Sequence, residues 1–436
     1  MTRNSTSSAA PRVYFLTLGC PKNEADSDAM SGLLGSSGFQ VVHTLDEADV
    51  VILNTCGFIR DAVQESIDTA LELADWRDAQ PGRRLVLVGC MVTRYAEDLS
   101  QALTEPDAFV SLAEEPQLAG VLGRLTGFAP RQGSEHHPAA QISAYLKVSD
   151  GCHRTCAYCT IPAIRGPYRS TPLPEILQRT RESVERGAQE IVLIGQDISA
   201  YGRDLEQAIG LPDVIRAVAA IDGVEWVRLM YVQPDGVTPE LIEVIANEPK
   251  VCHYLDIPLQ HASQPVLRAM RRRGSGPEFL GMLERLREAV PDIVLRTTFI
   301  AGFPGETRSD VTELLEFVRA ARFDYVGVFP YSPEEGTAAQ KMPGLPDRRT
   351  RVRRAQRVRD AADEVGLARA EARVGAELDV LSEGLDDDGV PVGRWRGQAP
   401  EIDGLVLLDR DVTPGDLVRV RITGAAGYDL EGEVLT

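Results

Sequence analysis

Three cysteines close together in the sequence could hold an iron-sulfur cluster. Cys152, Cys156 and Cys159 are spaced C-x3-C-x2-C in the segment GCHRTCAYC. Three thiolates on one tight loop can bind three irons of a 4Fe-4S cluster, and no fourth cysteine lies nearby to complete the usual ligand set. One iron would therefore stay open to another ligand. The alternative is a structural zinc site, but zinc needs a fourth nitrogen or sulfur ligand, which His153 is poorly placed to supply from inside the loop.

A second set of three cysteines has no local metal motif but shares a position. Cys20, Cys56 and Cys90 each directly follow an apolar run, in the strings VYFLTLGC, VVILNTC and RLVLVGC. If these runs are parallel strands, all three thiols emerge at the carboxyl edge of one sheet, where open α/β folds bind ligands. A glycine adjoins each cysteine, as expected where the backbone turns closely. We predict a second cluster here; the alternative is three buried cysteines, a common fate of this residue type.

The elements that would carry the second set form an N-terminal α/β domain. Apolar runs at 13–18, 50–53 and 85–88 alternate with helix-like stretches, such as 63–74, where apolar residues recur at helical spacing. This pattern predicts an open α/β domain over residues 1–130. The segment APRQGSEHHPAA has no hydrophobic periodicity and is rich in proline, glycine and charged residues, so we place a linker at 131–140.

The central region repeats a strand followed by a helix, which indicates a parallel sheet. The strand-like runs are residues 145–149, 191–195, 226–232, 254–259, 294–300 and 325–329. Six units are fewer than the eight of a closed barrel. The sequence therefore predicts a partial, TIM-like (β/α)6 barrel over residues 141–369, with its chemistry at the carboxyl ends of the strands.

The C-terminal region has the sequence pattern of a small all-β barrel. Short strand-like pieces at 377–381, 404–408 and 417–422 are broken by Gly, Pro and Asp, which places this domain at 370–436. It is preceded by residues 348–359, which hold seven arginines. Such a run is usually a solvated helix face, and a contact with RNA is the alternative. The whole chain is thus α/β with a small β-barrel at its end.

Composition excludes several classes of protein. The 46 Lys and Arg against 65 Asp and Glu give a net charge of −19, which disfavours non-specific binding to nucleic acid. No apolar stretch is long enough to span a membrane, and the polar start of the sequence lacks the apolar core of a secretory signal. We therefore expect a cytoplasmic protein with no membrane partner, whose seven cysteines stay reduced and available for metal or catalysis.

The cysteine loop and its surroundings resemble the radical S-adenosylmethionine superfamily, and two three-cysteine sites narrow the resemblance to its methylthiotransferases. The similarity runs over nearly the whole chain, in the strings TLGCPKNEADSDAM, NTCGFIRDAVQES, GCMVTRY, KVSDGCHRTCAYCTIPAIRG, DIPLQHAS, RTTFIAGFPGET, PYSPEEGT and APEIDG. In this resemblance the C-terminal barrel corresponds to the family's TRAM domain.

The resemblance implies the cofactors and partners. Cys152, Cys156 and Cys159 would hold the cluster whose open iron chelates S-adenosylmethionine, and cleavage of that molecule would give a 5′-deoxyadenosyl radical. Cys20, Cys56 and Cys90 would hold an auxiliary 4Fe-4S cluster that carries the sulfur. One S-adenosylmethionine would donate the methyl group and another would make the radical. An electron donor such as a flavodoxin or ferredoxin and a sulfur source are implied, whereas no catalytic residue beyond the cluster ligands is required.

The family divides by substrate into a tRNA adenosine branch and a branch that modifies the β-carbon of an aspartate in ribosomal protein S-twelve. Residues 370–436 contain 15 Asp and Glu against six Arg and no Lys, so their net charge is 6 − 15 = −9. Such a surface would repel tRNA and attract a basic ribosomal protein. We therefore predict the ribosomal-protein substrate. Arg271–Arg273 and the arginine run keep the tRNA alternative open, and a non-catalytic iron-sulfur or zinc protein is a further alternative.

Four residues are predicted contacts of S-adenosylmethionine from their position alone. Gln196 and Asp197 follow the second strand of the predicted barrel, and Gly302 and Glu306 follow the fifth. The carboxyl ends of these strands should face the cofactor. Cys252 has no cysteine at a useful spacing, so we expect it to be a small buried residue.

Overall fold

The computed structural model of the protein describes residues 10–131, 133 and 141–435. The chain forms two units: an N-terminal unit, Met1–Ala139 with Thr160–Pro167, and a C-terminal unit, Ala140–Cys159 with Tyr168–Thr436. Nearly all of the predicted linker at 131–140 lies outside the described residues. The short segment 160–167 follows the cysteine loop in sequence but groups with the N-terminal unit.

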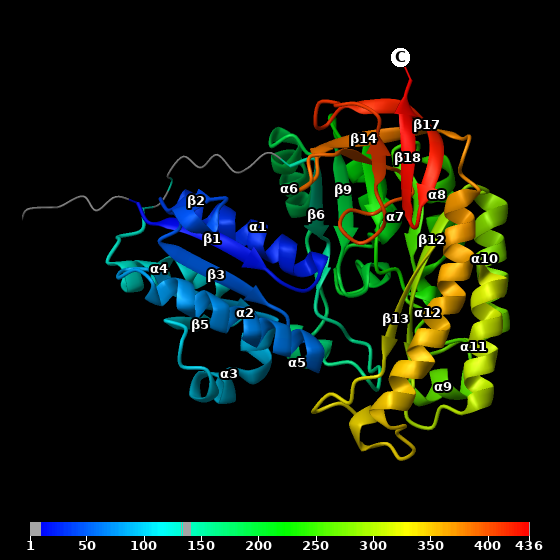
Figure 1. Ribbon diagram of the computed structural model, residues 1–436, viewed down its shortest axis with the longest axis horizontal. Helices are drawn as coiled ribbons and strands as arrows, with labels where there is room; N and C mark the ends of the chain where they lie inside the picture. Colours follow the sequence, from blue (N-terminus) through cyan, green and yellow to red (C-terminus); the bar gives the residue numbers. More distant parts are fainter. Residues whose placement is uncertain (1–9, 132, 134–140, 436) are drawn as a thin grey trace, which may run out of the picture. The chain divides into compact units, whose positions relative to one another are not determined.

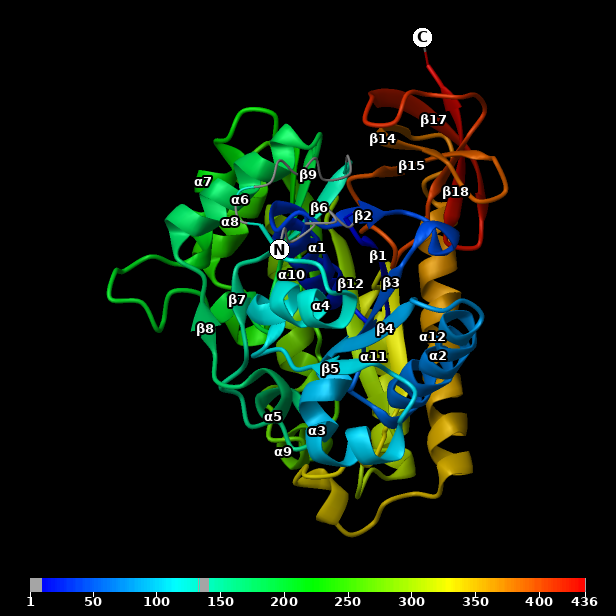
Figure 2. The ribbon, with the colours of Figure 1, turned by 90° about the vertical axis from the view of Figure 1, so that its left-hand side faces the viewer.

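The N-terminal unit alternates strands and helices, as predicted. Its elements are β1 (Arg12–Thr17), α1 (Pro21–Ser36), β2 (Gln40–Val42), the 3-10 turn Leu45–Glu47, β3 (Val50–Thr55), α2 (Arg60–Asp78), β4 (Arg84–Gly89), α3 (Cys90–Ala102), β5 (Ala108–Val110), the 3-10 turn Glu115–Gln117, α4 (Leu118–Thr126) and α5 (Ile161–Arg165). The strands pair in parallel in the order β2-β1-β3-β4-β5, and Figure 2 shows β1, β3, β4 and β5 side by side.

Both faces of this sheet are buried, which explains why its central strands read as continuous apolar runs. Successive side chains point to opposite faces of a strand. Leu53 and Leu87 accordingly pack with residues of α2 and α3, whereas Ile52 and Val88 pack with residues of α1 and α4. The predicted open α/β domain is thus confirmed as a sheet with helices on both faces.

The C-terminal unit begins with the partial barrel. Its elements are β6 (Ser143–Lys147), β7 (Ser149–Asp150), β8 (Arg169–Ser170), α6 (Leu173–Glu185), β9 (Glu190–Ile194), the 3-10 turn Ile198–Ala200, α7 (Leu211–Ala219), β10 (Trp226–Leu229), the 3-10 turn Pro234–Gly236, α8 (Pro239–Asn247), β11 (Val251–Asp256), α9 (Gln264–Ala269), α10 (Gly276–Ala289), β12 (Val294–Ala301), α11 (Arg308–Ala321), β13 (Tyr325–Pro330), the 3-10 turn Ala339–Lys341 and α12 (Arg348–Glu371).

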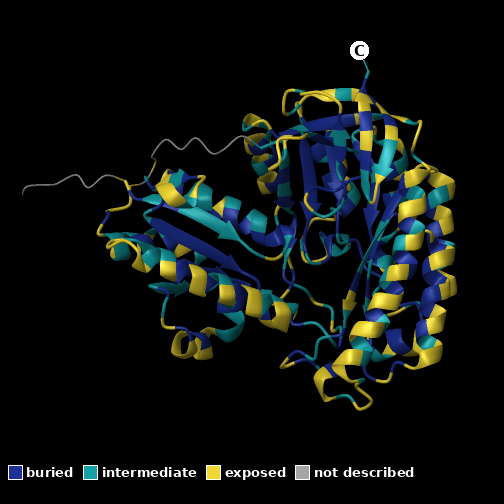
Figure 3. Ribbon diagram, in the orientation of Figure 1, coloured by how far each residue is buried: buried dark blue, intermediate teal, exposed yellow. Residues whose placement is uncertain are grey.

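Strands β6, β9, β10, β11, β12 and β13 pair in parallel in chain order, so the predicted six-unit open barrel is confirmed. Helices α10, α11 and α12 lie along its outer side, where α12 packs on β13 and α11 (Figure 1). Strands β9 and β10 are buried along their whole length, whereas Figure 3 shows that the outward faces of these helices are exposed. The arginine run lies in α12, and Ala355 and Val358 between its arginines are buried against the barrel core.

The chain ends in a closed β-barrel, also as predicted. Its strands are β14 (Glu377–Leu385), β15 (Pro391–Trp395), β16 (Val406–Leu408), β17 (Leu417–Ala426) and β18 (Asp429–Val434). They close in the order β14-β15-β16-β18-β17. The segment between β15 and β16 contacts the partial barrel, where Tyr145 donates to the Pro400 carbonyl at 2.9 Å and Tyr254 to Asp403 at 2.8 Å.

Among the described residues, every helix is too short or too polar to cross a lipid bilayer.

Candidate active site

The first three candidate cysteines lie at the ends of three adjacent parallel strands. Cys20 follows β1 and is the N-cap of α1, Cys56 directly follows β3, and Cys90 begins α3 directly after β4. The strand ends are in register, since Thr17 pairs with Asn54 and Thr55 pairs with Gly89. The sheet therefore brings the three thiols to one edge, as the three matching strings predicted.

Two glycines permit this close approach. Gly19 has a φ of +105°, and a Cβ added there would lie 2.8 Å from the Cβ of Cys56 and 3.1 Å from its sulfur. A Cβ on Gly57 would lie 2.7 Å from the backbone of Met91 and 2.8 Å from the carbonyl carbon of Cys90. The turn at Gly19 therefore packs against Cys56, and the turn at Gly57 packs against Cys90, at distances that leave no room for a side chain on either glycine.

Buried amides fix the start of α1 against the strand ends. Asn23 donates to the Leu18 carbonyl at 2.7 Å and to the Thr55 carbonyl at 3.2 Å, and Asn54 donates to the Asn23 carbonyl at 2.9 Å. Asn54 also donates to Ser27 at 3.0 Å. Because buried amides that lose their partners are costly, this network holds the turn that carries Cys20 in place.

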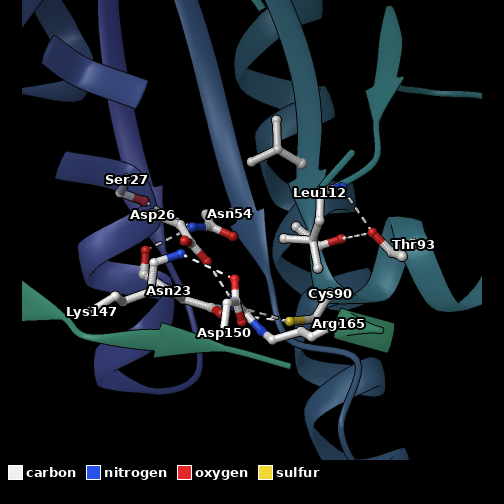
Figure 4. Close-up of polar contacts among 12 residues, drawn as sticks. Asn23, Asp26, Ser27, Asn54, Cys90, Thr93, Leu112, Lys147, Asp150 and Arg165 are labelled. Carbon is white, nitrogen blue, oxygen red and sulfur yellow. Dashed lines mark hydrogen bonds and ion pairs between the residues drawn. The ribbon is translucent and has the colours of Figure 1, made fainter. Parts of the chain in front are cut away.

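A charged side chain contacts this group of cysteines. Arg165, at the end of α5, donates from Nη2 to the Cys90 sulfur at 3.4 Å and to Asp26 at 2.8 Å (Figure 4). Burial raises the pKa of the Cys56 thiol and raises that of Cys90 to about 12, whereas the Arg165 charge acts to lower both. A metal that binds here must displace these protons.

The other candidate cysteines lie on a loop of the C-terminal unit. Cys152, Cys156 and Cys159 follow β6 and the two-residue strand β7, whose antiparallel pairing with β8 closes the loop at its base. The Cys159 amide donates to the Cys156 carbonyl at 3.2 Å, and the Arg154 amide donates to the Cys152 sulfur at 3.4 Å. These local bonds keep the loop tight.

Two arginines bind this loop to the strand ends around it. The Arg154 guanidinium donates to Asp197 at 2.6 Å and to Asp235 at 2.7 Å. Arg272 approaches the Cys156 sulfur at 3.8 Å and donates to Gln233 at 2.9 Å. The sequence left Arg272 open as an RNA contact. In the structure its guanidinium is instead bonded within the C-terminal unit, next to the cysteine loop.

The four predicted S-adenosylmethionine contacts divide into two groups. Gln196 and Asp197 lie directly after β9, and Asp197 is buried and paired with Arg154. The Oε1 atom of Gln196 is buried and has no hydrogen-bond partner among the residues that the structure describes. Gly302 and Glu306 lie after β12, and the Gly302 amide donates to Glu306 at 2.7 Å. Glu306 also accepts from Arg354 at 2.9 Å. Glu306 thus shapes its own loop.

Arg154, Arg165 and Arg272 were not predicted to be part of the sites. Arg154 and Arg165 lie inside the quoted string KVSDGCHRTCAYCTIPAIRG, but spacing alone assigns an arginine no partner. Their proximity to cysteines in a metal-binding pattern was the available signal. Cys252 is fully buried in β11, as predicted.

The donor sets suit a cluster better than one ion. Among the described residues, no three His, Cys, Asp or Glu side chains are close enough together to hold a single metal ion. A cubane differs in that each cysteine binds a different iron, so its ligands need not converge on one point.

Three known families match successive parts of the chain. They are the uncharacterized protein family UPF0004 over residues 12–111, the radical SAM superfamily over 146–318 and the TRAM domain over 374–435. Each match contains the features described above: the first cysteine set, the cysteine loop on its parallel barrel, and the closed β-barrel.

Relatives match over the full length. A "Ribosomal protein uS12 methylthiotransferase RimO" from Geobacter sulfurreducens is 43% identical and covers 99% of this chain and 100% of its own. A protein of the same name from Symbiobacterium thermophilum is 44% identical and covers 97% of this chain and 90% of its own. The chain belongs to the RimO family of methylthiotransferases. As a radical SAM protein of the RimO family, it takes a 4Fe-4S cluster and S-adenosylmethionine as cofactors.

Solved structures agree with the fold of this RimO family member. The radical S-adenosylmethionine methyltransferase TsrM from Kitasatospora setae gives a TM-score of 0.54 at 12% identity, covering 85% of this chain and 80% of its own. The cobalamin-dependent radical enzyme OxsB gives 0.52 at 12% identity, covering 82% of this chain and 58% of its own. At such identities the likeness concerns the fold alone.

Proposed function

We propose that this protein inserts a methylthio group at the β-carbon of an aspartate of ribosomal protein uS12 (S-twelve). The observation that carries the proposal is the pair of three-cysteine sets, one at the ends of β1, β3 and β4 and the other on the loop after β7, in a chain of the RimO family. The cytoplasm, where ribosomal proteins are made, is the proposed place of the reaction.

Each cysteine set would hold its own 4Fe-4S cluster. Cys20, Cys56 and Cys90 would hold the auxiliary cluster. The radical SAM cluster would be held by Cys152, Cys156 and Cys159. When bound, these clusters and S-adenosylmethionine supply the one-electron chemistry and the sulfur and methyl groups. The electron would come from a donor such as a flavodoxin or ferredoxin, and the sulfur from a separate source.

The protein's own residues would position these groups. Gln196 is the best direct contact for S-adenosylmethionine, because its buried Oε1 has no partner within the described part of the chain and can accept from an amino or hydroxyl group. Asp197 would act through Arg154, a residue of the cysteine loop that it holds in place. Gly302 and Glu306 would form the wall after β12, since their mutual hydrogen bond fixes that turn.

The C-terminal barrel supports the choice of a protein substrate. Two of its loops carry exposed acidic residues, Asp387 and Asp388 between β14 and β15 and Asp411 between β16 and β17. These carboxylates would attract a basic ribosomal protein and repel the phosphates of RNA.

A second candidate, a tRNA adenosine methylthiotransferase, is favoured by one observation. Arg349, Arg353 and Arg357 are exposed on α12 at a spacing of four residues, which places them along one face of the helix. Such a row suits contacts with phosphates.

A paired digest separates the two candidates. The protein is expressed anaerobically with uS12, and both uS12 and bulk tRNA are digested for mass spectrometry. We expect one methylthiolated aspartate in uS12 and no change in tRNA. A variant with Cys152, Cys156 and Cys159 replaced by alanine should give no product. An unmodified aspartate beside a newly methylthiolated adenosine would establish the second candidate, and no product in either would contradict both.

A further inference from the structure

A buried ion pair lies beside the cysteines of the N-terminal unit. Arg165 and Asp26 are 2.8 Å apart, and their side chains are 2% and 3% exposed. Burying two charges costs free energy that their mutual attraction repays only with good geometry and further hydrogen bonds. The same Arg165 nitrogen also donates to Asn23 Oδ1 at 3.1 Å, which supplies such a bond.

The third partner of this nitrogen is sulfur. Nη2 of Arg165 lies 3.4 Å from the Cys90 sulfur, and Figure 4 shows it between Cys90 on one side and Asn23 and Asp26 on the other. The Cys90 thiol also lies 3.7 Å from Asn23 Oδ1. One guanidinium therefore couples a fixed carboxylate to a proposed iron ligand.

Charges this close to a thiolate ligand act on the cluster it holds. A cluster bound by three thiolates gains negative charge on reduction, because one electron enters and no bond needs to break. A buried cation stabilises the reduced form and a buried anion opposes it, since the low dielectric screens neither strongly. Hydrogen bonds to the sulfurs and nearby charge are established determinants of cluster potentials.

We propose that Arg165, with Asp26 as its fixed counter-charge, is a positioning residue that sets the reduction potential of the cluster held by Cys20, Cys56 and Cys90. The proposal rests on the assignment of an auxiliary cluster to these cysteines. Arg165 raises the potential and Asp26 lowers it, so the pair holds the cluster at an intermediate value.

The test uses substitutions that remove opposite charges. Arg165→Met, Arg165→Lys and Asp26→Asn are made in the full chain with Cys152, Cys156 and Cys159 replaced by alanine, so that the auxiliary cluster is the one observed. The midpoint potential is measured by anaerobic titration with dithionite and electron paramagnetic resonance. Arg12→Met and Asp49→Asn, at the ion pair of 2.9 Å beside the start of β1, are the matched controls.

We expect shifts of opposite sign. Asp26→Asn should raise the potential and Arg165→Met should lower it, each by at least a tenfold change in the reduction equilibrium, or 59 mV for one electron. Arg165→Lys, which keeps the charge, should shift it less than Arg165→Met, and the controls should leave it unchanged. If Arg165→Met fails to take up iron, Asp26→Asn still tests the proposal, because its midpoint potential should be higher than that of the parent protein. Arg165→Lys, which keeps the charge, should stay closer to the parent.

The outcomes also separate this inference from the proposed function. Shifts of the same sign, or no shift, in a protein that carries the auxiliary cluster would contradict the role of the ion pair. A parent protein that binds no cluster once Cys152, Cys156 and Cys159 are replaced by alanine would contradict the auxiliary site itself, and with it the proposed function.

Discussion

Arg394 and Glu190 lie 2.6 Å apart with both side chains fully buried, and this pair joins the C-terminal β-barrel to β9 of the partial barrel. Glu190 also accepts from Arg228 at 2.6 Å, and Arg394 donates to Glu383 at 2.7 Å. Each of these two charges therefore has more than one partner in the protein interior. The network is costly to bury, but once formed it is more costly to break.

We first predict that Arg394→Met destabilises the protein by about 3–5 kcal/mol, because it leaves Glu190 buried beside one arginine in place of two. The control is Arg419→Met in the same barrel. Arg419 pairs with Asp379 at 3.0 Å, but both side chains are about half exposed, so its loss should cost much less than that of Arg394. Urea unfolding of both variants under anaerobic conditions measures the difference, and equal costs would contradict the role of the buried network.

The same network predicts a loss of stability in acid. Burial alone would raise the pKa of Glu190, but the charges of Arg228 and Arg394 lower it from 4.5 to about 2. Because the folded pKa is the lower one, the unfolded chain binds a proton first, and stability present above pH 4.5 is lost as the pH falls toward 2. The contribution is about 3 kcal/mol.

Urea midpoints measured in steps from about pH 6 to pH 3 test this dependence. Glu190→Gln cannot titrate, so its midpoint should be lower at neutral pH but should fall less in acid than that of the unchanged protein. A parallel fall in both proteins would assign the acid sensitivity to other carboxylates.

The sequence predicted what has a local signature. Cys20, Cys56 and Cys90 could be placed at one sheet edge because apolar runs that are buried on both faces end directly at each of them. The short strands β2 and β5, of three residues each, lack such a run and were not predicted. Their pairing depends on the neighbouring strand, which a local pattern cannot reveal.

Contacts between distant charged residues could not be predicted at all. Arg165 meets Asp26 from 139 residues away, and Arg394 meets Glu190 from 204 residues away. Charged residues are mostly exposed, so nothing in their types or spacing marks these as buried. Only the folded chain shows that the arginine of the string IPAIRG, Arg165, is directed at a cysteine.

Gly19→Ala should impair the auxiliary site. The φ of +105° disfavours any side chain, and a Cβ would lie 2.8 Å from that of Cys56, so the turn must move. We expect iron and sulfide to fall by about one cluster per chain, with the radical SAM cluster retained. Gly32→Ala, in α1 with open space around it, should keep both clusters and stabilise the helix by about 1 kcal/mol. Equal iron contents in the two variants would contradict this reading.

Asp197→Asn should slow the cleavage of S-adenosylmethionine. Asp197 is buried and holds Arg154, whereas Asp235, the other partner of Arg154, is about half exposed. A hydrogen bond to a buried charged group is worth about 1.5–3 kcal/mol, which predicts a fall of about tenfold or more for Asp197→Asn. Asp235→Asn should cause a smaller fall, because solvent screens that pair. The measurement is the rate of 5′-deoxyadenosine formation at equal iron content, and a larger effect of Asp235→Asn would contradict the proposed role of Asp197.

Neutralising three exposed acidic residues of the C-terminal barrel should weaken binding of uS12 without changing the chemistry. The triple variant carries Asn at Asp387, Asp388 and Asp411. Asp386 is kept, because it accepts from the Val390 amide at 2.8 Å and shapes the loop. We expect KM for uS12 to rise about tenfold at low salt with kcat unchanged, since exposed charges contribute to encounter and affinity but not to the reacting centre.

The control removes the same charge elsewhere on the molecule. Glu284, Glu313 and Glu316 are exposed on α10 and α11, and their replacement by glutamine also raises the net charge by three. If the barrel is the docking surface, only the first triple variant raises KM, and the gap between the two closes above about 0.5 M salt because screening suppresses exposed charges. A similar rise in both would mean that net charge alone attracts uS12, and the barrel would lose its assigned role.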